Sequence, residues 1–286
     1  MKGHMYWSVR RELWENRSIY VAPFAIAVLA LFGFFTHVGK FAEHMRRIDT
    51  LAAQRQLIEV VMPYGMIASA ILFIGVLVAV FYCADALNGE RRDRSILFWK
   101  SMPVSDRVTV LSKALVAIAL VPLIACAFAL ATQVVMLLTS TAVLAAKGID
   151  PGIQLSRMPL AEMPVTMLYG VAAHALWYAP IYAWLLLVSA WARRAPLLWA
   201  ALPFFAAIVF EMLAFGTSHV LSLVKYRITG AMAEAFVPNA MKTPVTDLSQ
   251  LDPAKFLSSP GLWLGLLFAV ACLAIAIRVR RYREPN

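Results

Sequence analysis

Six long hydrophobic runs divide the chain, with short charged stretches between them. Each run approaches or exceeds the roughly 20 residues that a helix needs to cross a bilayer. Helices satisfy their own backbone hydrogen bonds in lipid, and no ten-residue alternation typical of a membrane barrel is present. The pattern predicts an all-α membrane protein with one transmembrane domain, residues 1–286, and spans at 19–36, 60–84, 114–146, 165–192, 195–220 and 261–277.

The composition supports this interpretation. The chain is 62% hydrophobic and 15% charged, and its mean hydropathy is +0.73. Soluble domains are nearer half apolar and a quarter charged. We therefore expect lipid, rather than water, to surround most of the chain.

Lys and Arg are unequally divided between the two sides. With six spans both termini lie on one side, which carries sixteen basic residues against ten on the other. The richer side is the cytoplasmic one by the positive-inside rule. Both termini are thus expected in the cytoplasm, and the net charge of +10 is explained by this topology and by membrane lipids with anionic headgroups. No nucleic-acid partner is needed.

The N-terminal stretch 4–17, "HMYWSVRRELWENR", combines aromatic and charged residues at helical spacing. Trp7 and Trp14 are seven residues apart, and Arg10 and Arg11 lie between them. The pattern predicts an amphipathic helix on the inner leaflet. The alternative is a plain cytoplasmic extension of the first span.

The stretch 88–113, "NGERRDRSILFWKSMPVSDRVTVLSK", joins the second and third spans. We predict a break at Asn88-Gly89, a short cytoplasmic helix at 92–102, and a new helix from Asp106 capped by Ser105. The short helix would offer a partner Ile96, Leu97, Phe98 and Trp99, and Pro103 would end it. The alternative is a basic loop that binds headgroups, with Trp99 as an interface anchor.

Three polar residues fall at lipid depth. Glu211 lies within the fifth run, where an ionised carboxylate is costly unless it faces protein or water. It either lines a substrate path or anchors a hydrogen-bond relay between helices, or it is a protonated or paired structural glutamate. Gln133 and His174 lie in the third and fourth runs, and packing residues that hydrogen-bond between helices are the more common role for such groups.

The sequence lacks recognisable catalytic machinery. It contains no G-x-x-x-x-G-K-[ST] phosphate loop, no H-E-x-x-H pair and no G-x-S-x-G elbow. Cys83, Cys126 and Cys272 are scattered among the runs, which favours small packing residues over a disulfide framework or a metal site. We expect no enzyme activity and no cofactor in this chain.

The stretch "ERRDRSILFWKSMPVSDRVTVLSK" resembles the signature region of ABC-2 type permeases, the membrane subunits of ATP-binding-cassette exporters. The matching residues are Glu90, Arg91, Arg92, Pro103, Ser105 and Lys113, and "RRELWENR" resembles the family's interfacial helix. With six spans, the resemblance covers essentially the whole chain. It implies an exporter subunit in the bacterial cytoplasmic (inner) membrane.

The resemblance also implies partners. Two cytoplasmic ATPase subunits would bind ATP and Mg, and a second copy of this chain or a homologous permease would complete the assembly. The ATPase would contact the coupling helix at 92–102, and secondarily the Arg193-Arg194 turn; the implied coupling residues are Glu90, Arg91, Arg92, Arg94, Ile96, Leu97, Phe98, Trp99, Pro103, Arg193 and Arg194. In related exporters the second and fifth spans line the substrate cavity, which makes Glu211, Phe210 and Met212 candidates.

Two other functions stay open. A non-transporting signalling or immunity subunit could use the same coupling helix. A membrane-embedded enzyme acting on lipids, with Glu211 and His174 as acid and base, lacks a supporting motif. The sequence leaves the substrate open, although a lone glutamate hints at a cationic or hydrogen-bonding group.

Overall fold

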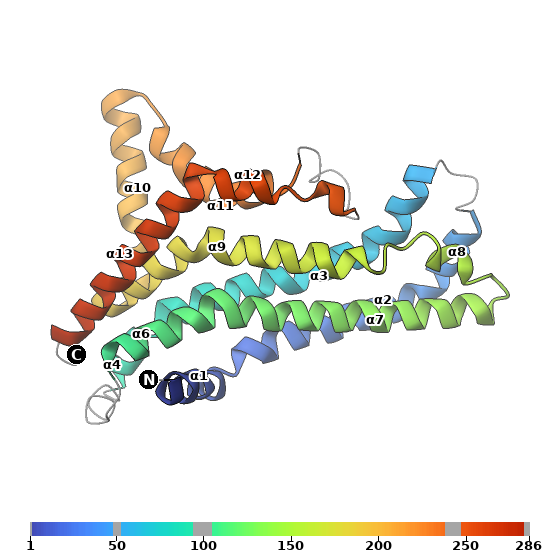
Figure 1. Cartoon of the computed structure of the whole chain (residues 1–286), viewed down its shortest axis with the longest axis horizontal. Coiled ribbons are helices and arrows are strands. Elements are labelled where there is room, and N and C mark those ends of the chain that lie inside the picture. Colours follow the sequence, from blue (N-terminus) through green and yellow to red (C-terminus); the bar gives the residue numbers. More distant parts are fainter. Residues whose placement is uncertain (1, 48–52, 94–104, 238–246, 283–286) are drawn as a thin grey trace.

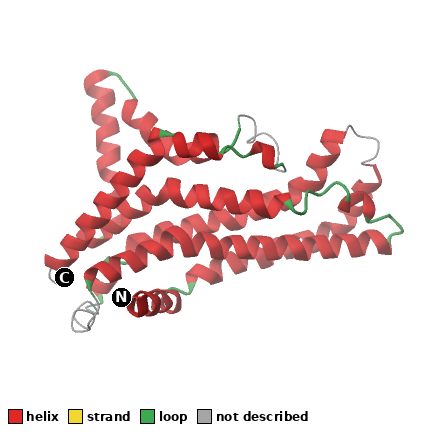
Figure 2. Cartoon of the chain, viewed as in Figure 1, coloured by secondary structure: helices red, strands yellow, loops and turns green. Residues whose placement is uncertain are grey.

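The computed structural model describes residues 2–47, 53–93, 105–237 and 247–282, and nearly all of them are helical (Figure 2). The α-helices are α1 (Lys2–Glu15), α2 (Ser18–Arg47), α3 (Ala53–Asp85), α4 (Asn88–Arg92), α6 (Asp106–Leu115), α7 (Val121–Ala146), α8 (Gly152–Leu155), α9 (Glu162–Trp191), α10 (Pro196–Phe215), α11 (His219–Ala235), α12 (Pro253–Ser258) and α13 (Pro260–Tyr282). Among these residues no strand forms, and Phe236 and Leu251 make an isolated antiparallel bridge. The all-α prediction is confirmed.

The six predicted spans correspond to six helical segments that are long and apolar enough to cross a membrane. The third is one continuous segment, Asp106–Ala146, because a π-helical turn at Val116–Leu120 joins α6 to α7. Ser105 caps its first turn as predicted, since its Oγ accepts a hydrogen bond from the Val108 amide at 3.4 Å. The predicted helix at 92–102 lies mostly outside the described residues: α4 ends at Arg92 and the structure describes the chain only to Asp93.

The predicted fifth span, 195–220, is too long. The helix α10 ends at Phe215, and Gly216 follows in the left-handed region with φ of +63°. Hydropathy alone did not register this stop, because the apolar residues continue past it. A separate helix, α11, then begins at His219 and folds back onto α9 (Figure 1).

Four long helices, α2, α3, α7 and α9, run side by side and form the body of the molecule (Figure 1). The last helix, α13, packs along α9 and contacts α6. By contrast α10 diverges from this bundle, and only 11% of its apolar window is buried within the chain. The main core lies where α3, α9 and the π-helical turn meet, around Cys83, Ala117 and Tyr182.

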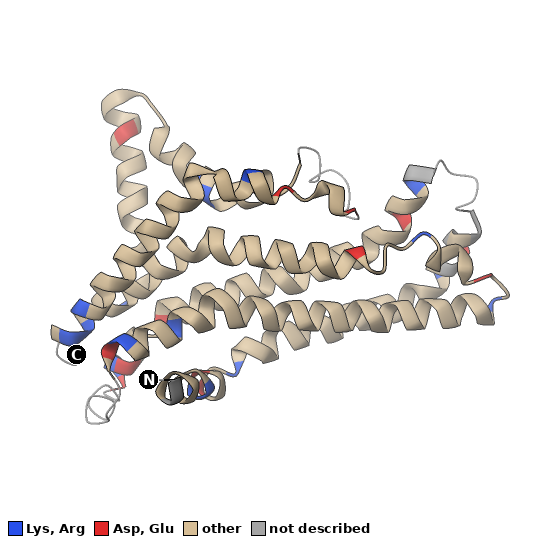
Figure 3. Cartoon of the chain, viewed as in Figure 1, with Lys and Arg blue, Asp and Glu red and all other residues tan. Residues whose placement is uncertain are grey.

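Both ends of the described chain lie at one end of the bundle, close to α4 (Figure 1). Along the four long helices charged residues gather at the two ends and are sparse between them, and a further group lies on α11 and α12 (Figure 3). This distribution is typical of helices whose middle parts lie in hydrocarbon. The assignment of the terminus-bearing end to the cytoplasm stays a prediction from the charge bias.

Candidate functional site

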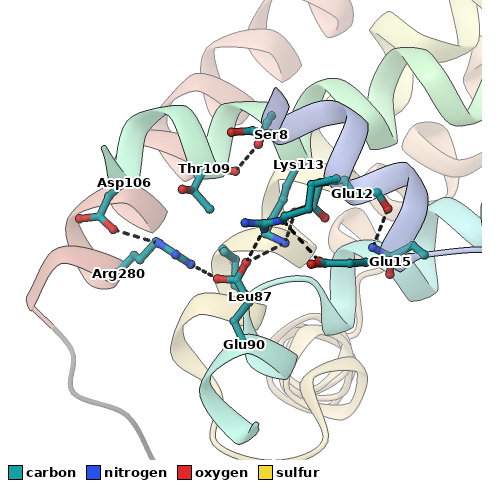
Figure 4. Close-up of polar contacts among 12 residues, drawn as sticks. Ser8, Glu12, Glu15, Leu87, Glu90, Asp106, Thr109, Lys113 and Arg280 are labelled. Atoms are coloured by element: carbon teal, nitrogen blue, oxygen red, sulfur yellow. Dashed lines mark hydrogen bonds and ion pairs between the residues drawn. The ribbon is translucent and has the colours of Figure 1, made fainter. Parts of the chain in front are cut away.

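A buried network of charged side chains lies at the terminus-bearing end, where α3 passes into α4 (Figure 4). Its centre is Glu90, which the short helix α4 turns inward. One carboxylate oxygen of Glu90 lies 3.1 Å from Lys113 Nζ on α6. The other accepts a hydrogen bond from the Arg280 guanidinium on α13. Glu90 thus links three helices that are far apart in sequence.

The N-terminal helix adds the second carboxylate. Glu12 has no exposed surface, and its Oε1 accepts a hydrogen bond from Lys113 Nζ at 2.8 Å. Its Oε2 accepts one from the Tyr82 hydroxyl at 2.8 Å, and Arg11 Nη2 lies 2.8 Å from Oε1. On the same helix, burial raises the pKa of Glu15, which lies 3.4 Å from Arg11 Nε. The helix α1 is therefore bound to the bundle by ion pairs and apolar contacts together.

Arg280 completes the network by pairing with Asp106, whose Oδ1 lies 3.0 Å from Arg280 Nε. Apart from Glu15, whose side chain is 53% exposed, three carboxylates and three cations meet: Glu12, Glu90 and Asp106 with Arg11, Lys113 and Arg280. Their charges balance, which is the condition under which ions are tolerated away from water. The network holds α1, α4, α6 and α13 together at one end of the molecule.

Arg91, the neighbour of Glu90, fastens α4 to the end of α9. Its Nη2 donates to the backbone carbonyls of Ser189 at 2.7 Å and Ala192 at 2.6 Å. The last carbonyls of a helix have no partner within it and carry partial negative charge, which a guanidinium offsets. The Ser189 hydroxyl also accepts hydrogen bonds from the amides of Leu87 and Asn88, each at 3.0 Å.

The predicted coupling residues thus divide into two groups. Arg91 is buried and the Glu90 side chain is only 9% exposed, so in this structure they fasten helices to one another rather than present side chains to a partner. Arg92, Arg193 and Arg194 are exposed. The remaining predicted coupling residues, Arg94, Ile96, Leu97, Phe98, Trp99 and Pro103, lie outside the described residues.

The predicted N-terminal helix is present as α1, and it crosses the direction of the bundle (Figure 1). Trp7 and Trp14 are exposed, and the Arg10 guanidinium lies over both rings, at 5.3 and 4.6 Å from their centroids. Arg11 points the other way, into the network. One face of α1 therefore carries aromatic side chains suited to a membrane interface, while the opposite face binds the bundle.

A cavity of about 800 Å³ lies between α3 and α9, with α7 and α11 contributing to its walls. It contains two of the predicted polar residues, Gln133 and His174. The His174 ring stacks on Tyr178 with centroids 4.2 Å apart, and its Nε2 lies 3.0 Å from the Tyr182 hydroxyl. Gln133 donates to the Tyr64 carbonyl at 3.4 Å. Gln133 thus bridges α7 and α3, as expected for a packing residue, whereas the contacts of His174 lie within its own helix, α9. Both residues also face the cavity.

Glu211, Phe210 and Met212 do not line this cavity. The Glu211 carboxylate instead accepts hydrogen bonds from the amides of His219 and Val220, at 2.6 and 2.7 Å, and from the Thr217 hydroxyl at 2.7 Å. It therefore caps the N-terminus of α11, where free amides and the helix dipole favour a negative group. The cavity between α3 and α9 is thus not the one expected between the second and fifth spans, and a substrate-lining role for Glu211, Phe210 and Met212 stays a prediction.

Sequence reasoning missed most of the network. Glu12, Tyr82, Asp106 and Arg280 were either unremarked or used only for orientation and capping, and Lys113 was noted only for orientation and as part of the family resemblance. One signal was present: Glu12 shares a helix face with Val9 and Leu13, both of which pack on the core. The pairing itself joins residues up to 190 positions apart, and no local pattern encodes that.

All three cysteines are free and buried, which agrees with the packing role predicted for them. Within the described ranges, no group of three or more His, Cys, Asp or Glu side chains is placed to hold a metal ion. Comparisons with protein-family models, with curated proteins and with solved structures found no match.

Proposed function

We propose that this chain is the membrane subunit of an ATP-binding-cassette exporter, and that a separate cytoplasmic ATPase drives it. The observation that supports this most is the buried network around Glu90. It fastens α1, α6 and α13 to α4, from which the chain continues into the segment 94–104. A displacement of that segment would be transmitted to four helices through the ion pairs of the network.

The expected mechanism follows from this connection. Closure of two ATPase subunits around ATP and Mg would displace the segment 94–104, here called the coupling segment. The helices joined by the network would move with it. Packed helices switch between discrete arrangements rather than deform continuously. Two such arrangements with different affinity for a substrate would suffice to move it across the membrane.

The alternative of a lipid-modifying enzyme loses its proposed acid–base pair. The Glu211 carboxylate is occupied by the first amides of α11, and His174 lies in the cavity, to which Glu211 does not contribute. The two side chains share no contact in the described part of the chain. A non-transporting signalling subunit would use the same coupling segment and is separated from an exporter by a transport assay.

Co-purification tests the proposal. The tagged chain, expressed with the ATP-binding-cassette ATPases of its source organism, is expected to isolate one of them in a stable complex whose ATP turnover differs from that of the ATPase alone. The double variant Phe98→Ala/Trp99→Ala should lower the yield of the complex while the chain still inserts. The double variant Phe205→Ala/Leu213→Ala, on exposed positions of α10, serves as the matched control. Failure to recover any complex with the wild-type chain would overturn the proposal.

A further inference from the structure

The cavity between α3 and α9 has an unusually uniform chemistry. Among the described residues that line it there is no Asp, Glu, Lys or Arg. Its polar side chains are Ser69, Gln133, Thr166, His174 and Tyr178, none of which carries a permanent charge. A charged ligand would lose its hydration here without gaining a counter-ion, and that exchange is strongly unfavourable.

Methionines supply much of the apolar wall. Met62 and Met66 stand one turn apart on α3, Met163 and Met167 one turn apart on α9, and Met232 contributes from α11. Thioether side chains are flexible and polarisable, so they adapt to apolar groups of varied shape. Thioethers and imidazole also bind soft metal ions such as Cu(I), and this is the main competing occupant.

One end of the cavity borders the main core and has polar side chains in its lining. Its lining stops at Val76 on α3 and Tyr178 on α9, and the next turns of both helices enter the main core at Ala79 and Tyr182. His174 lies near this end. Its Nε2 contacts Tyr182, and no hydrogen bond reaches its Nδ1 within the described part of the chain. Nδ1 can therefore donate a hydrogen bond to a ligand or accept one from it.

We propose that this cavity binds an uncharged molecule with a hydrocarbon body, such as an acyl chain that bears a hydroxyl or ester group near His174. The volume of about 800 Å³ lies within the range of pockets that enclose a small ligand. The apolar body would lie against the methionines of α3 and α9. In the proposed exporter this molecule would be the transported substrate, so its transport rests on the proposed function. Its binding to the cavity does not.

Photolabelling tests the assignment without an ATPase, so its failure is distinguishable from failure of the proposed function. The wild-type chain is placed in nanodiscs of phosphatidylcholine and phosphatidylglycerol. The probe is a monoacylglycerol with a diazirine in its chain. We expect labelling concentrated in residues 62–76 and 163–178, competed by unlabelled monoacylglycerol but not by the same chain ended with a phosphate or a trimethylammonium group.

Two glycines allow the cavity to be filled. Gly65 lines the cavity and a Cβ there would meet no atom within 4 Å, so the side chain of Gly65→Phe should extend into the cavity and reduce specific labelling about tenfold. Gly170→Leu is a second filling variant, since its Cβ would lie 3.6 Å from the Phe236 ring. Gly33→Phe is the matched control: it places the same side chain in open space on α2, away from the cavity, and should leave labelling unchanged.

The source of the ligand is read from the lipids that co-purify. If a neutral lipid co-purifies at a higher level with the wild-type chain than with Gly65→Phe, the membrane is the source of the ligand. If no such lipid is enriched but the probe still labels the cavity, the ligand is a free apolar compound. Three outcomes would overturn the proposal. The first is labelling that is spread equally over α10 and α13 and is insensitive to Gly65→Phe. The second is stronger labelling by a charged analogue of the probe. The third is displacement of the probe by stoichiometric Cu(I).

Discussion

At the scale of single residues, the most informative feature is a set of charged side chains at buried positions, where ions are ordinarily excluded. Glu12 and Lys113 expose 0% and 3% of their side chains and lie 2.8 Å apart. Such a pair adds little net stability, because the desolvation of both ions offsets their attraction. Removing one partner is different, since it leaves the other ion buried and unpaired.

Lys113→Met is therefore expected to lower the free energy of unfolding by about 3–5 kcal/mol, because Glu12 and Glu90 lose their shared cation. Arg92→Met removes a cation of the same charge whose pairing with Asp85, at 3.6 Å, is exposed, and should cost about 0–1 kcal/mol. Thermal unfolding in detergent, followed by size-exclusion fluorescence, measures both. Adding Glu12→Gln to Lys113→Met should restore part of the loss. Equal effects of the two single variants would contradict the burial argument.

Glu211→Ala should act on the stability of α11 and leave labelling of the cavity unchanged. The lost cap is expected to cost about 0.5–2 kcal/mol, because two helix amides and Thr217 lose their acceptor. Hydrogen exchange of residues 219–224 should accelerate. Asp252→Ala removes the equivalent cap of α12, which accepts from the Lys255 amide at 2.9 Å. This variant should leave the hydrogen exchange of residues 219–224 unchanged. A change in probe binding with unaltered exchange would restore Glu211 as a pathway residue.

At the scale of elements, an arginine on α11 passes between two helices and helps to hold α11 in place. Arg227 donates to the carbonyl of Trp177 on α9 at 3.0 Å and to that of Gly261 on α13 at 2.7 Å. Its guanidinium lies over the Trp177 ring, 4.7 Å from the centroid, and burial lowers its pKa. Because α11 forms part of the cavity wall, this contact also shapes the cavity.

Gly265 on α13 makes room for that arginine. A Cβ at this position would lie 2.1 Å from Arg227 Nη2, so Gly265→Ala must displace the guanidinium. We expect a loss of about 2 kcal/mol, as hydrogen bonds from a charged donor are broken, with faster hydrogen exchange across α11. Gly33→Ala, where a Cβ meets no atom within 4 Å, should be neutral or slightly stabilising in its helix. Unchanged exchange of α11 in Gly265→Ala would show that Arg227 has another equally good position.

At the scale of the whole molecule, the bundle has two distinct ends. One carries both termini, α4 and the turn at Arg193-Arg194, and the other carries α8 (Figure 1). The positive-inside rule assigns the first end to the cytoplasm. The orientation decides which end could meet a soluble ATPase.

Cysteine labelling tests that orientation directly. The native cysteines are buried, so the background should be low. A membrane-impermeant maleimide added to intact cells should label Ser156→Cys, which follows α8, but should label Arg194→Cys only after permeabilisation. Both positions are exposed. The reverse pattern would exclude a cytoplasmic partner at α4.

The sequence alone determined the class of the molecule, because hydropathy over about 20 residues is a local property that lipid imposes directly. Six membrane helices, the N-terminal helix and the Ser105 cap could all be derived from neighbouring residues. The stop at Gly216 was missed, since apolar residues continue on both sides of a backbone turn. Glu211 was identified as unusual but left between two roles, because its partners are the amides of the following helix. Only the tertiary structure brought together Glu12, Glu90, Lys113 and Arg280, and only it placed the cavity between α3 and α9. Ion pairing and cavity shape depend on which helices become neighbours, and that is a property of packing in three dimensions.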